Sequence, residues 1–409
     1  MASICFYFQA HQPFRLRPYS FFTMGSHEEY FDQAFNREIL ERVSDRCYLP
    51  TNKVLLRLIE KYPKQFKVSF SLTGTLLDQL EAWRPDVIES FQALAKTGQV
   101  EFLAETYYHS LAYLFSKREF VIQVRQLERR IFELFGQKPK VFRNTELIYH
   151  NELAPFISGL GFQGMLCEGV NSLLLGRSPN YVYSAVDTPN FSLLLKNHTL
   201  SDDLAFRFAD PHWSEFPLTP SKYTSWMDQA GAERDVINLF MDYETFGEHH
   251  DETETGIRKF FQAFVDQVIH HPNLDFTIPS ETINRYRAKS VYDAPDFTSW
   301  ADQERDLSAW LGNPLQIETA RRIYAIEDDL KDTNPALLDR WRRLQSSDHF
   351  YYMSRKEGSD GEVHAYFSHY SSPQAAFSNY SNVLNDIELW AKEQRVDRDQ
   401  ESGYQKKRV

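Results

Sequence analysis

Cysteine is scarce in this sequence, and the few cysteines are not placed to form a disulfide framework or a metal-binding pair. Three occur in 409 residues, Cys5, Cys47 and Cys167, and none belongs to a CxxC motif. An odd number of widely spaced cysteines is typical of free, buried thiols in a reducing compartment. The cysteine content therefore argues against a disulfide-stabilised secreted protein.

Long apolar runs are also missing at the start of the chain. The first residues read MASICFYFQAHQP, with no basic segment and only a short apolar run before Gln9 and His11. This run is too short for a signal peptide or for a membrane-spanning helix. We therefore expect a cytoplasmic protein with no membrane partner.

Positive charge is in deficit. Lys and Arg total 45 against 57 Asp and Glu, which gives a formal net charge of -12, and no basic run interrupts the first 390 residues. An acidic chain does not attract phosphate backbones, so nucleic acid is excluded as an expected partner. A neutral, hydroxyl-rich ligand such as a sugar is electrostatically indifferent to this charge.

Aromatic residues, in contrast, are plentiful. The chain has 32 Phe, 22 Tyr and 7 Trp, which together make up 15% of its residues. Aromatic faces stack on sugar rings, but they also fill large cores. We expect most of these rings to lie in the core.

Short apolar runs recur along the first 240 residues, each followed by polar or glycine-containing residues and, in several cases, by a helical pattern. Such runs, bounded by turn residues, are typical of buried strands. They predict seven strands, at Ile4–Phe8, Phe66–Phe70, Val100–Leu103, Val141–Phe142, Phe162–Leu166, Phe191–Leu195 and Val236–Met241.

Helical patterns fit between several of these strands. Apolar residues recur at helical spacing between Val121 and Phe135, and again between Leu55 and Tyr62, where Pro63 ends the pattern. Alternation of strands and helices predicts a parallel α/β architecture, which could be a barrel or a doubly wound sheet.

The pattern changes to mostly helical at about residue 299. Apolar spacing there predicts helices at Pro314–Leu330, Ala336–Gln345 and Pro373–Glu393, with an extended piece at Val363–Phe367. We therefore predict an α/β domain at 1–298, a C-terminal helical domain at 299–394 and a polar tail at 395–409 that frays.

Three polar clusters directly follow predicted strands: AHQP at 10–13, FRNTELIY at 142–149 and MDYETFGEHH at 241–250. The carboxyl ends of parallel strands converge on one face, where catalytic loops collect. Glu146 and Asp242 can therefore share a pocket although they are 96 positions apart. Two carboxylates facing one cleft are the minimum requirement for glycoside hydrolysis, although a single strand-end carboxylate is more often part of a helix cap or a salt bridge.

The histidines of these clusters are ambiguous. His11 is followed by Gln12 and Pro13, which places a polar donor and a stiff turn at a strand end, although a lone histidine there is usually structural. The stretch GEHHDET, which contains His249 and His250, matches no zinc-binding spacing such as HExxH. We interpret it as a solvated loop.

Five motifs together resemble the conserved regions of glycoside hydrolase family 57, especially its α-amylase branch. They occur in the order of that family and span residues 10 to 313. FRNTELIY and DYETFGEH are the most specific, because both contain a carboxylate where the family has one. The five are AHQP, GQVEFLAETYYHS, FRNTELIYHN, MDYETFGEH and SAWLGN.

This resemblance implies an incomplete, seven-stranded (β/α)7 barrel followed by a helical bundle, which agrees with the seven predicted strands. It implies a retaining hydrolase of α-1,4-glucosidic bonds, acting on α-glucans or maltooligosaccharides without a cofactor or a catalytic metal. Matching the third motif makes Glu146 the nucleophile, and matching the fourth makes Asp242 the general acid/base. Retention requires their carboxyl groups to lie about 5–5.5 Å apart.

The other motifs are implied to surround the sugar. His11 and Glu101 are expected to hold sugar hydroxyls or to orient the catalytic pair, and His109 and His249 to form walls. Trp310 is expected to offer a stacking face, or alternatively to pack in a domain-interface core.

Three alternatives stay open at this point. A 4-α-glucanotransferase uses the same two carboxylates, with a sugar hydroxyl in place of water. A metal-dependent carbohydrate deacetylase needs an Asp/His/His set, which the sequence does not convincingly offer. A non-catalytic glucan-binding protein would retain the pocket without turnover, although the intact Glu146 and Asp242 pair argues against it.

Overall fold

The computed structural model describes residues 1–25, 29–232, 234–330 and 334–406, with side chains described up to residue 393. Its elements divide into two compact units. Unit 1 comprises 1–12, 37–105 and 124–300, and unit 2 comprises 13–36, 106–123 and 301–409. The boundary expected at 298 lies within two residues of the end of unit 1, whereas two earlier segments group with the C-terminal residues.

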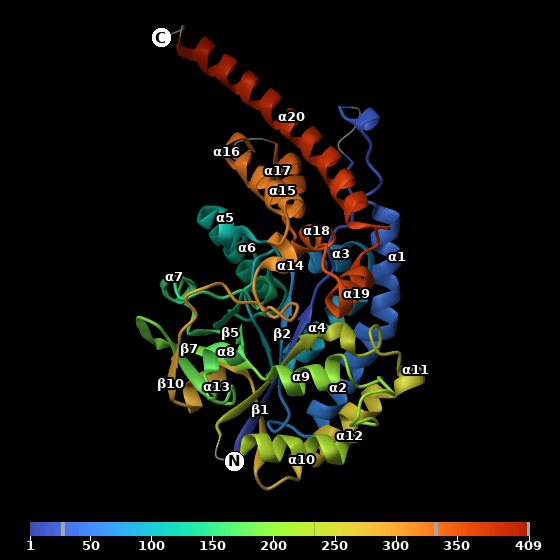
Figure 1. Ribbon diagram of the computed structural model, residues 1–409, viewed down its shortest axis with the longest axis vertical. Helices are drawn as coiled ribbons and strands as arrows, with labels where there is room; N and C mark the ends of the chain where they lie inside the picture. Colours follow the sequence, from blue (N-terminus) through green and yellow to red (C-terminus); the bar gives the residue numbers. More distant parts are fainter. Residues whose placement is uncertain (26–28, 233, 331–333, 407–409) are drawn as a thin grey trace. The chain divides into compact units, whose positions relative to one another are not determined.

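All ten strands of the described residues lie in unit 1 (Figure 1). Each predicted strand overlaps one of them, and β6, β9 and β10 are additional. The strands are β1 (Ala2–Ala10), β2 (Val68–Leu72), β3 (Val100–Phe102), β4 (Val141–Arg143), β5 (Gly164–Glu168), β6 (Val182–Ala185), β7 (Thr188–Lys196), β8 (Val236–Asp242), β9 (Leu274–Thr277) and β10 (Ser290–Tyr292).

Seven of these strands close into a parallel barrel. The order is β1, β2, β3, β4, β5, β7 and β8, and β8 pairs with β1 again. Strand pairing in this ring is reduced to one residue pair at two places. β3 meets β4 through a bridge between Ala104 and Phe142, and β7 pairs with β8 at Lys196 and Asn238. β6 runs antiparallel beside β7 and carries β10, while β9 pairs with the first half of β1. The expected incomplete (β/α)7 barrel is confirmed.

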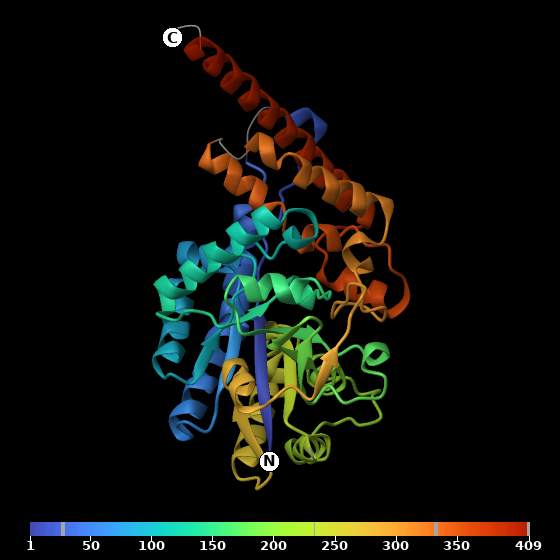
Figure 2. The same ribbon diagram turned by 90° about the vertical axis from the view of Figure 1, so that its left-hand side faces the viewer.

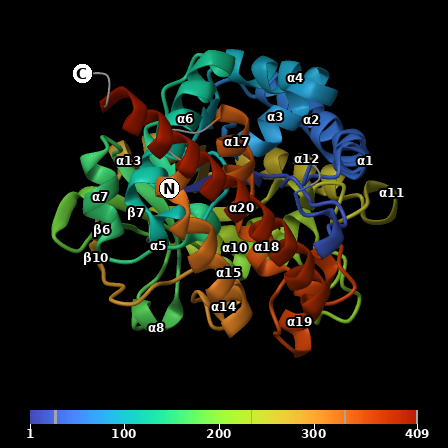
Figure 3. The ribbon, with the colours of Figure 1, turned by 90° about the horizontal axis from the view of Figure 1, so that it is seen from above.

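The helices of unit 1 surround these strands (Figures 2 and 3). The first residues of α1 and α6 are assigned to unit 2. These helices, with a π-helical turn η2 (Ser44–Tyr48) and two 3₁₀ turns, are α1 (Gln33–Val43), α2 (Leu49–Lys61), α3 (Gly74–Trp83), α4 (Pro85–Lys96), α6 (Lys117–Phe135), α7 (Leu153–Gly159), α8 (Asn171–Leu174), α9 (His198–Ala205), α10 (Pro220–Gly231), α11 (Glu252–Thr255), α12 (Ile257–Ile269), α13 (Pro279–Arg285), η3 (Thr145–Leu147) and η4 (Tyr243–Thr245).

Aromatic side chains fill the layer between strands and helices, as expected. Residues of β1 alternate, since Cys5 and Tyr7 belong to the core cluster inside the barrel while Phe6 and Phe8 contact rings outside it. The ring of Phe6 lies 5.3 Å from that of Phe261 on α12, edge to face. Strands buried on both faces read as continuous apolar runs, which is why the sequence revealed them.

Unit 2 is helical in its C-terminal part. Its helices, with a 3₁₀ turn η1 (Phe21–Thr23), are α5 (Ala112–Phe115), α14 (Ser308–Leu311), α15 (Pro314–Ala325), α16 (Glu327–Leu330), α17 (Pro335–Arg343), α18 (Ser347–Tyr351), α19 (Gly358–Phe367) and α20 (Pro373–Lys406). The extended piece predicted at Val363–Phe367 is wrong, because these residues form the end of α19. Helix α20 continues through most of the predicted polar tail to Lys406, and the fraying of this tail stays a prediction. None of the described helices combines the length and apolar character needed to span a membrane.

Substitution of Gly164 tests the packing of β5. A Cβ atom there would lie 2.4 Å from the Ser192 carbonyl oxygen on β7 and 2.7 Å from a methyl group of Ile283. We expect Gly164→Ala to lower the free energy of unfolding by about 1–3 kcal/mol, measured by denaturant titration, because the backbone of β7 cannot move away from the added methyl group. The matched control is Gly159→Ala on α7, where no atom lies within 4 Å and stability should be unchanged or slightly higher. Equal effects of the two substitutions would contradict the packing.

Candidate active site

The strand register places Asp242 and Glu146 at the carboxyl-terminal end of the barrel. Asp242 is the last residue of β8 and pairs with Gln9 of β1, which also pairs with Ser71 of β2. Glu146 follows the end of β4 by three residues, in the turn η3. Both carboxylates are partly exposed, so solvent or a ligand can reach them.

The backbone at Glu146 is strained. Its φ and ψ are 58° and 24°, and Leu147 follows with φ of 52°, so two consecutive non-glycine residues adopt the left-handed conformation. Such conformations cost about 1–3 kcal/mol each and persist where the surrounding structure imposes them. They concentrate at active sites and ligand clamps, which makes this turn a candidate site independently of any motif.

A later segment of the chain fixes the Glu146 turn. Tyr149 and Thr298 exchange two backbone hydrogen bonds, and the Trp300 amide donates to the Glu146 carbonyl oxygen at 3.2 Å. The indole Nε1–H of Trp300 donates to Glu146 Oε2 at 2.7 Å. The hydrogen bond therefore fixes the position of Oε2, and with it the orientation of the Glu146 carboxylate plane.

A hydrogen-bonded chain of buried side chains lies beneath these carboxylates. Tyr7 donates its hydroxyl proton to Gln9 Oε1 at 2.6 Å, and Gln9 Nε2 donates to Glu105 Oε1 at 2.9 Å. The other oxygen of Glu105 lies 3.5 Å from Nη1 of Arg143, and both of these side chains are fully buried. The chain connects the ends of β1, β3 and β4.

Arg143 couples the two candidate carboxylates. Burial by itself lowers the pKa of Arg143, but Tyr7, Glu105, Glu146 and Asp242 raise it, and the net shift is upward. Its Cζ also lies 4.9 Å from the centre of the Trp300 ring. Within the described residues, its Nε and Nη2 have no hydrogen-bond acceptor. Glu146 and Asp242 thus act on one buried cation.

Glu244 is a third acidic group beside Asp242. Burial, and then the charge of Asp242, raise the pKa of Glu244 to about 8, so it is largely protonated at neutral pH. Its Oε1 accepts a hydrogen bond from the Tyr48 hydroxyl. The backbone of His11 also interacts with this carboxyl group, and the His11 ring Nδ1 lies 2.9 Å from the Thr73 hydroxyl. His11 therefore lies beside Glu244, the acidic neighbour of Asp242.

His249 lies close to the same loop. Its amide donates to the Glu244 carbonyl oxygen at 2.9 Å, and burial, then His250, lower the pKa of His249 to about 4. The prediction of a solvated loop is wrong for His250, which is 6% exposed and contacts the Ala205 carbonyl oxygen through Nε2 at 2.9 Å. Among the residues that the structure describes, no cluster of three or more His, Cys, Asp or Glu is placed to hold a metal ion.

Glu101 lies deeper in the barrel than the other candidates. It pairs in register with Ser69, which is level with Tyr7, and its Oε2 accepts a hydrogen bond from the Ser280 amide at 2.9 Å. Burial raises its pKa to about 7, although this hydrogen bond opposes the shift. Glu105, four residues later, is the carboxylate at the strand end. A sugar-binding or orienting role for Glu101 stays a prediction.

His109 and Trp310 belong to unit 2. His109 is buried, with φ of 50°, and its carbonyl oxygen accepts from the Ser347 amide at 2.9 Å. Trp310 is 1% exposed and its ring lies 6.3 Å from that of Tyr351. The wall and stacking roles of these two residues stay predictions.

Three functional candidates were not identified from the sequence. Arg143 and Glu105 stand inside the quoted motifs FRNTELIY and ETYYHS, so a buried charge at a strand end could have indicated them. Trp300 carries no such signal, because its partner Glu146 lies 154 residues earlier.

Glu244 gives a test of the site by pH. A carboxyl group with a raised folded-state pKa stabilises the fold below its unfolded value, near 4.3, and loses that contribution as the pH rises to about 8. The contribution of Glu244 to the free energy of unfolding should therefore fall across this range, so the slope of stability against pH should be less negative, or more positive, in Glu244→Gln than in the wild type. Denaturant titrations at several pH values measure it, with Glu248→Gln, a partly exposed carboxylate of the same loop, as control. An unchanged slope in Glu244→Gln would contradict the buried, protonated state.

Comparisons with known proteins agree with this architecture. The sequence model of Glycosyl hydrolase family 57 matches residues 5–295. A "Putative alpha-amylase" from Methanocaldococcus jannaschii is 40% identical over 404 residues, covering 95% of this chain and 85% of the relative. A 4-alpha-glucanotransferase from Thermococcus kodakarensis is 21% identical and matches 74% of this chain, which spans 44% of that protein.

Two solved structures share the fold. The GH57-type branching enzyme from Pyrococcus horikoshii aligns with a TM-score of 0.68 at 12% identity, covering 96% of this chain and 94% of that one. The alpha-amylase AmyC from Thermotoga maritima aligns with a TM-score of 0.60 at 13% identity, covering 96% and 95%. The family model matches most of this chain, and a relative that is 40% identical covers 95% of it. This chain therefore belongs to glycosyl hydrolase family 57.

Proposed function

We propose that this protein is a retaining hydrolase of α-1,4-glucosidic bonds, with Glu146 as nucleophile and Asp242 as general acid/base. The observation that carries the proposal is the placement of both carboxylates at the strand ends, Glu146 in the turn after β4 and Asp242 at the end of β8, with one oxygen of Glu146 held by the Trp300 indole. The names of the relatives, alpha-amylase among them, support an α-glucan or maltooligosaccharide as substrate.

The reaction proceeds in two steps. In the first, a carboxylate oxygen of Glu146 bonds to the anomeric carbon, the glycosidic C–O bond breaks, and the proton of Asp242 passes to the departing oxygen. In the second, Asp242 takes a proton from water, the water oxygen attacks the same carbon, and the bond to Glu146 breaks. Two inversions give net retention. Neither step consumes a cofactor.

The chain's own residues position these groups. The Trp300 indole N–H restricts rotation of the Glu146 carboxylate, and the strained turn is held by the segment at 298–300. Arg143 supplies positive charge beneath the site, where little water competes with it. His11 and His249, which lie beside Asp242 and Glu244, are the proposed contacts to sugar hydroxyls.

Substrates with different leaving groups test the roles proposed for Glu146 and Asp242. With maltoheptaose, Glu146→Gln should lower kcat by roughly 10⁴-fold or more, and Asp242→Asn by about 10²–10⁴-fold. With a 4-nitrophenyl α-maltooligoside, whose leaving group needs little protonation, the first step of Asp242→Asn should recover while Glu146→Gln stays inactive. A burst of nitrophenol measures that step.

The products decide between hydrolysis and the alternative activity. Wild-type protein should shorten maltoheptaose, with the α-anomer formed first, as seen by chromatography and NMR. Chains longer than the substrate would instead indicate a 4-α-glucanotransferase, the activity named for the relative from Thermococcus kodakarensis. Binding without turnover would contradict both and leave a glucan-binding protein.

Trp300→Phe tests the positioning of the nucleophile. This change keeps the ring beside Arg143 but removes the hydrogen bond to Glu146, and a hydrogen bond to a charged group is worth about 1.5–3 kcal/mol. We expect kcat to fall about 10–100-fold with little change in KM. The control is Trp226→Phe on α10, whose ring contacts Trp213 and Tyr223. A rise in KM at constant kcat would contradict the positioning role.

We also propose a cytoplasmic location. The three cysteines are buried and unpaired, a state that a reducing compartment maintains. Cell fractionation with an antibody to the protein would check it.

A further inference from the structure

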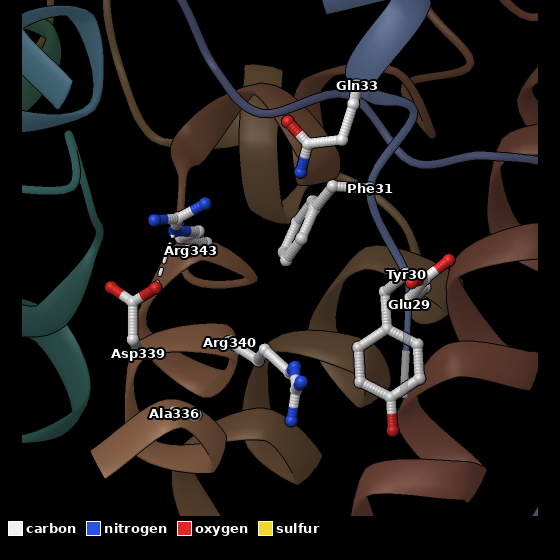
Figure 4. A pocket seen from close by; sticks show the side chains of 8 residues that line it. All are labelled: Glu29, Tyr30, Phe31, Gln33, Ala336, Asp339, Arg340 and Arg343. Atoms are coloured by element: carbon white, nitrogen blue, oxygen red, sulfur yellow. Dashed lines mark ion pairs between the residues drawn. The ribbon is translucent and has the colours of Figure 1, made fainter. Parts of the chain in front are cut away.

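Unit 2 contains a pocket that the proposed reaction does not use. Its volume is about 300 Å³, and it lies between the segment 29–33 and helix α17 (Figure 4). Pockets that hold small ligands measure about 300–1,000 Å³, so this one has room for a small group only. All of its lining residues that the structure describes belong to unit 2.

One wall is a single face of α17. Ala336, Asp339, Arg340 and Arg343 follow each other at intervals of three, one and three residues, which places them on one side of a helix. Asp339 is held from both sides, because its Oδ1 accepts from the Tyr108 hydroxyl at 3.0 Å and its Oδ2 lies 2.8 Å from Nε of Arg343. These polar groups are therefore oriented before any ligand binds.

The opposite wall is also held in place. Arg17 N–H donates to the Tyr30 carbonyl oxygen and Asp32 N–H to the Arg15 carbonyl oxygen, both at 2.9 Å, so two extended segments pair. The Tyr30 hydroxyl donates to the buried Asp386 at 2.8 Å. Figure 4 shows the side chains of Phe31 and Gln33 projecting from this wall toward the α17 side. A preformed pocket loses little conformational entropy when it binds.

The chemistry of the lining selects the ligand. It presents two guanidinium groups, Arg340 and Arg343, and two carboxylates, Glu29 and Asp339, so the formal charges cancel. A free anion would meet the carboxylates, and a cation would meet the guanidinium groups. A sugar hydroxyl both donates and accepts, and therefore matches both kinds of group.

We propose that this pocket is a second carbohydrate site, which binds one or two glucose units of an α-glucan chain apart from the catalytic carboxylates. The substrate class rests on the proposed function, whereas the site itself rests on the pocket. Such a site raises the affinity of the protein for a polymer, because two tethered binding events reinforce each other.

Native electrophoresis in gels that contain glycogen tests the proposal. All variants are made in the Glu146→Gln background, so that turnover cannot degrade the polymer. Ala336→Trp places a large ring in the pocket from an exposed position, and Arg340→Gln removes one charged donor. The matched control is Ala34→Trp, an exposed alanine on α1 next to Gln33 that does not line the pocket. Thermal unfolding of each variant verifies that it is folded.

We expect Ala336→Trp and Arg340→Gln each to weaken the apparent affinity for glycogen about fivefold or more, and Ala34→Trp to change it less than twofold. Retardation equal to that of the Glu146→Gln parent in both pocket variants would overturn the proposal, as would a parent that glycogen does not retard. Restoration of full mobility by millimolar inorganic phosphate would also overturn it, in favour of an anion site.

The glycogen-binding test of the pocket and the maltoheptaose test of hydrolysis can fail independently. If the wild type fails to shorten maltoheptaose but retardation depends on Ala336 and Arg340, the pocket stands and the hydrolase assignment falls. If the wild type shortens maltoheptaose and both pocket variants bind glycogen like the parent, the hydrolase stands and the second site falls.

Discussion

The buried guanidinium of Arg143 is the charge on which the strand-end face of the barrel depends. A fully buried cation costs several kcal/mol unless carboxylates and hydrogen bonds compensate it. Glu105 supplies the direct ion pair, and Glu146 and Asp242 add longer-range attraction. Three carboxylates from separate parts of the chain therefore share a single buried positive charge at one end of the barrel.

The same arrangement meets the needs of a two-carboxylate reaction. A nucleophile must be held in one orientation, and Glu146, the proposed nucleophile, is held by its strained turn and by Trp300. The neighbouring Glu244 is kept largely protonated by burial and by the charge of Asp242. Its neutral side chain places an acidic group beside Asp242 without adding a second charge at neutral pH.

The barrel was predictable from the sequence because its strands are buried on both faces and read as apolar runs. The strands β6, β9 and β10, which lie outside the closed ring of seven, were missed because they mix polar with apolar residues. Residues 363–367 include valine and aromatic residues, which favour strands, but a helix that begins at Gly358 includes them. In the site, the motifs contained Glu146 and Asp242, whereas the contact of Trp300 with Glu146 depends on a tertiary fold that no spacing reveals.

The central claim is that Glu146 forms a covalent bond to the sugar, and trapping that bond tests it most directly. The protein would be treated with a 5-fluoro-α-maltosyl fluoride, whose fluorine slows the second step, then digested and analysed by mass spectrometry. The account predicts one added maltosyl group, on the peptide that contains Glu146, and no label in Glu146→Gln. A label on another carboxylate, or products released with inverted configuration and no label, would contradict it.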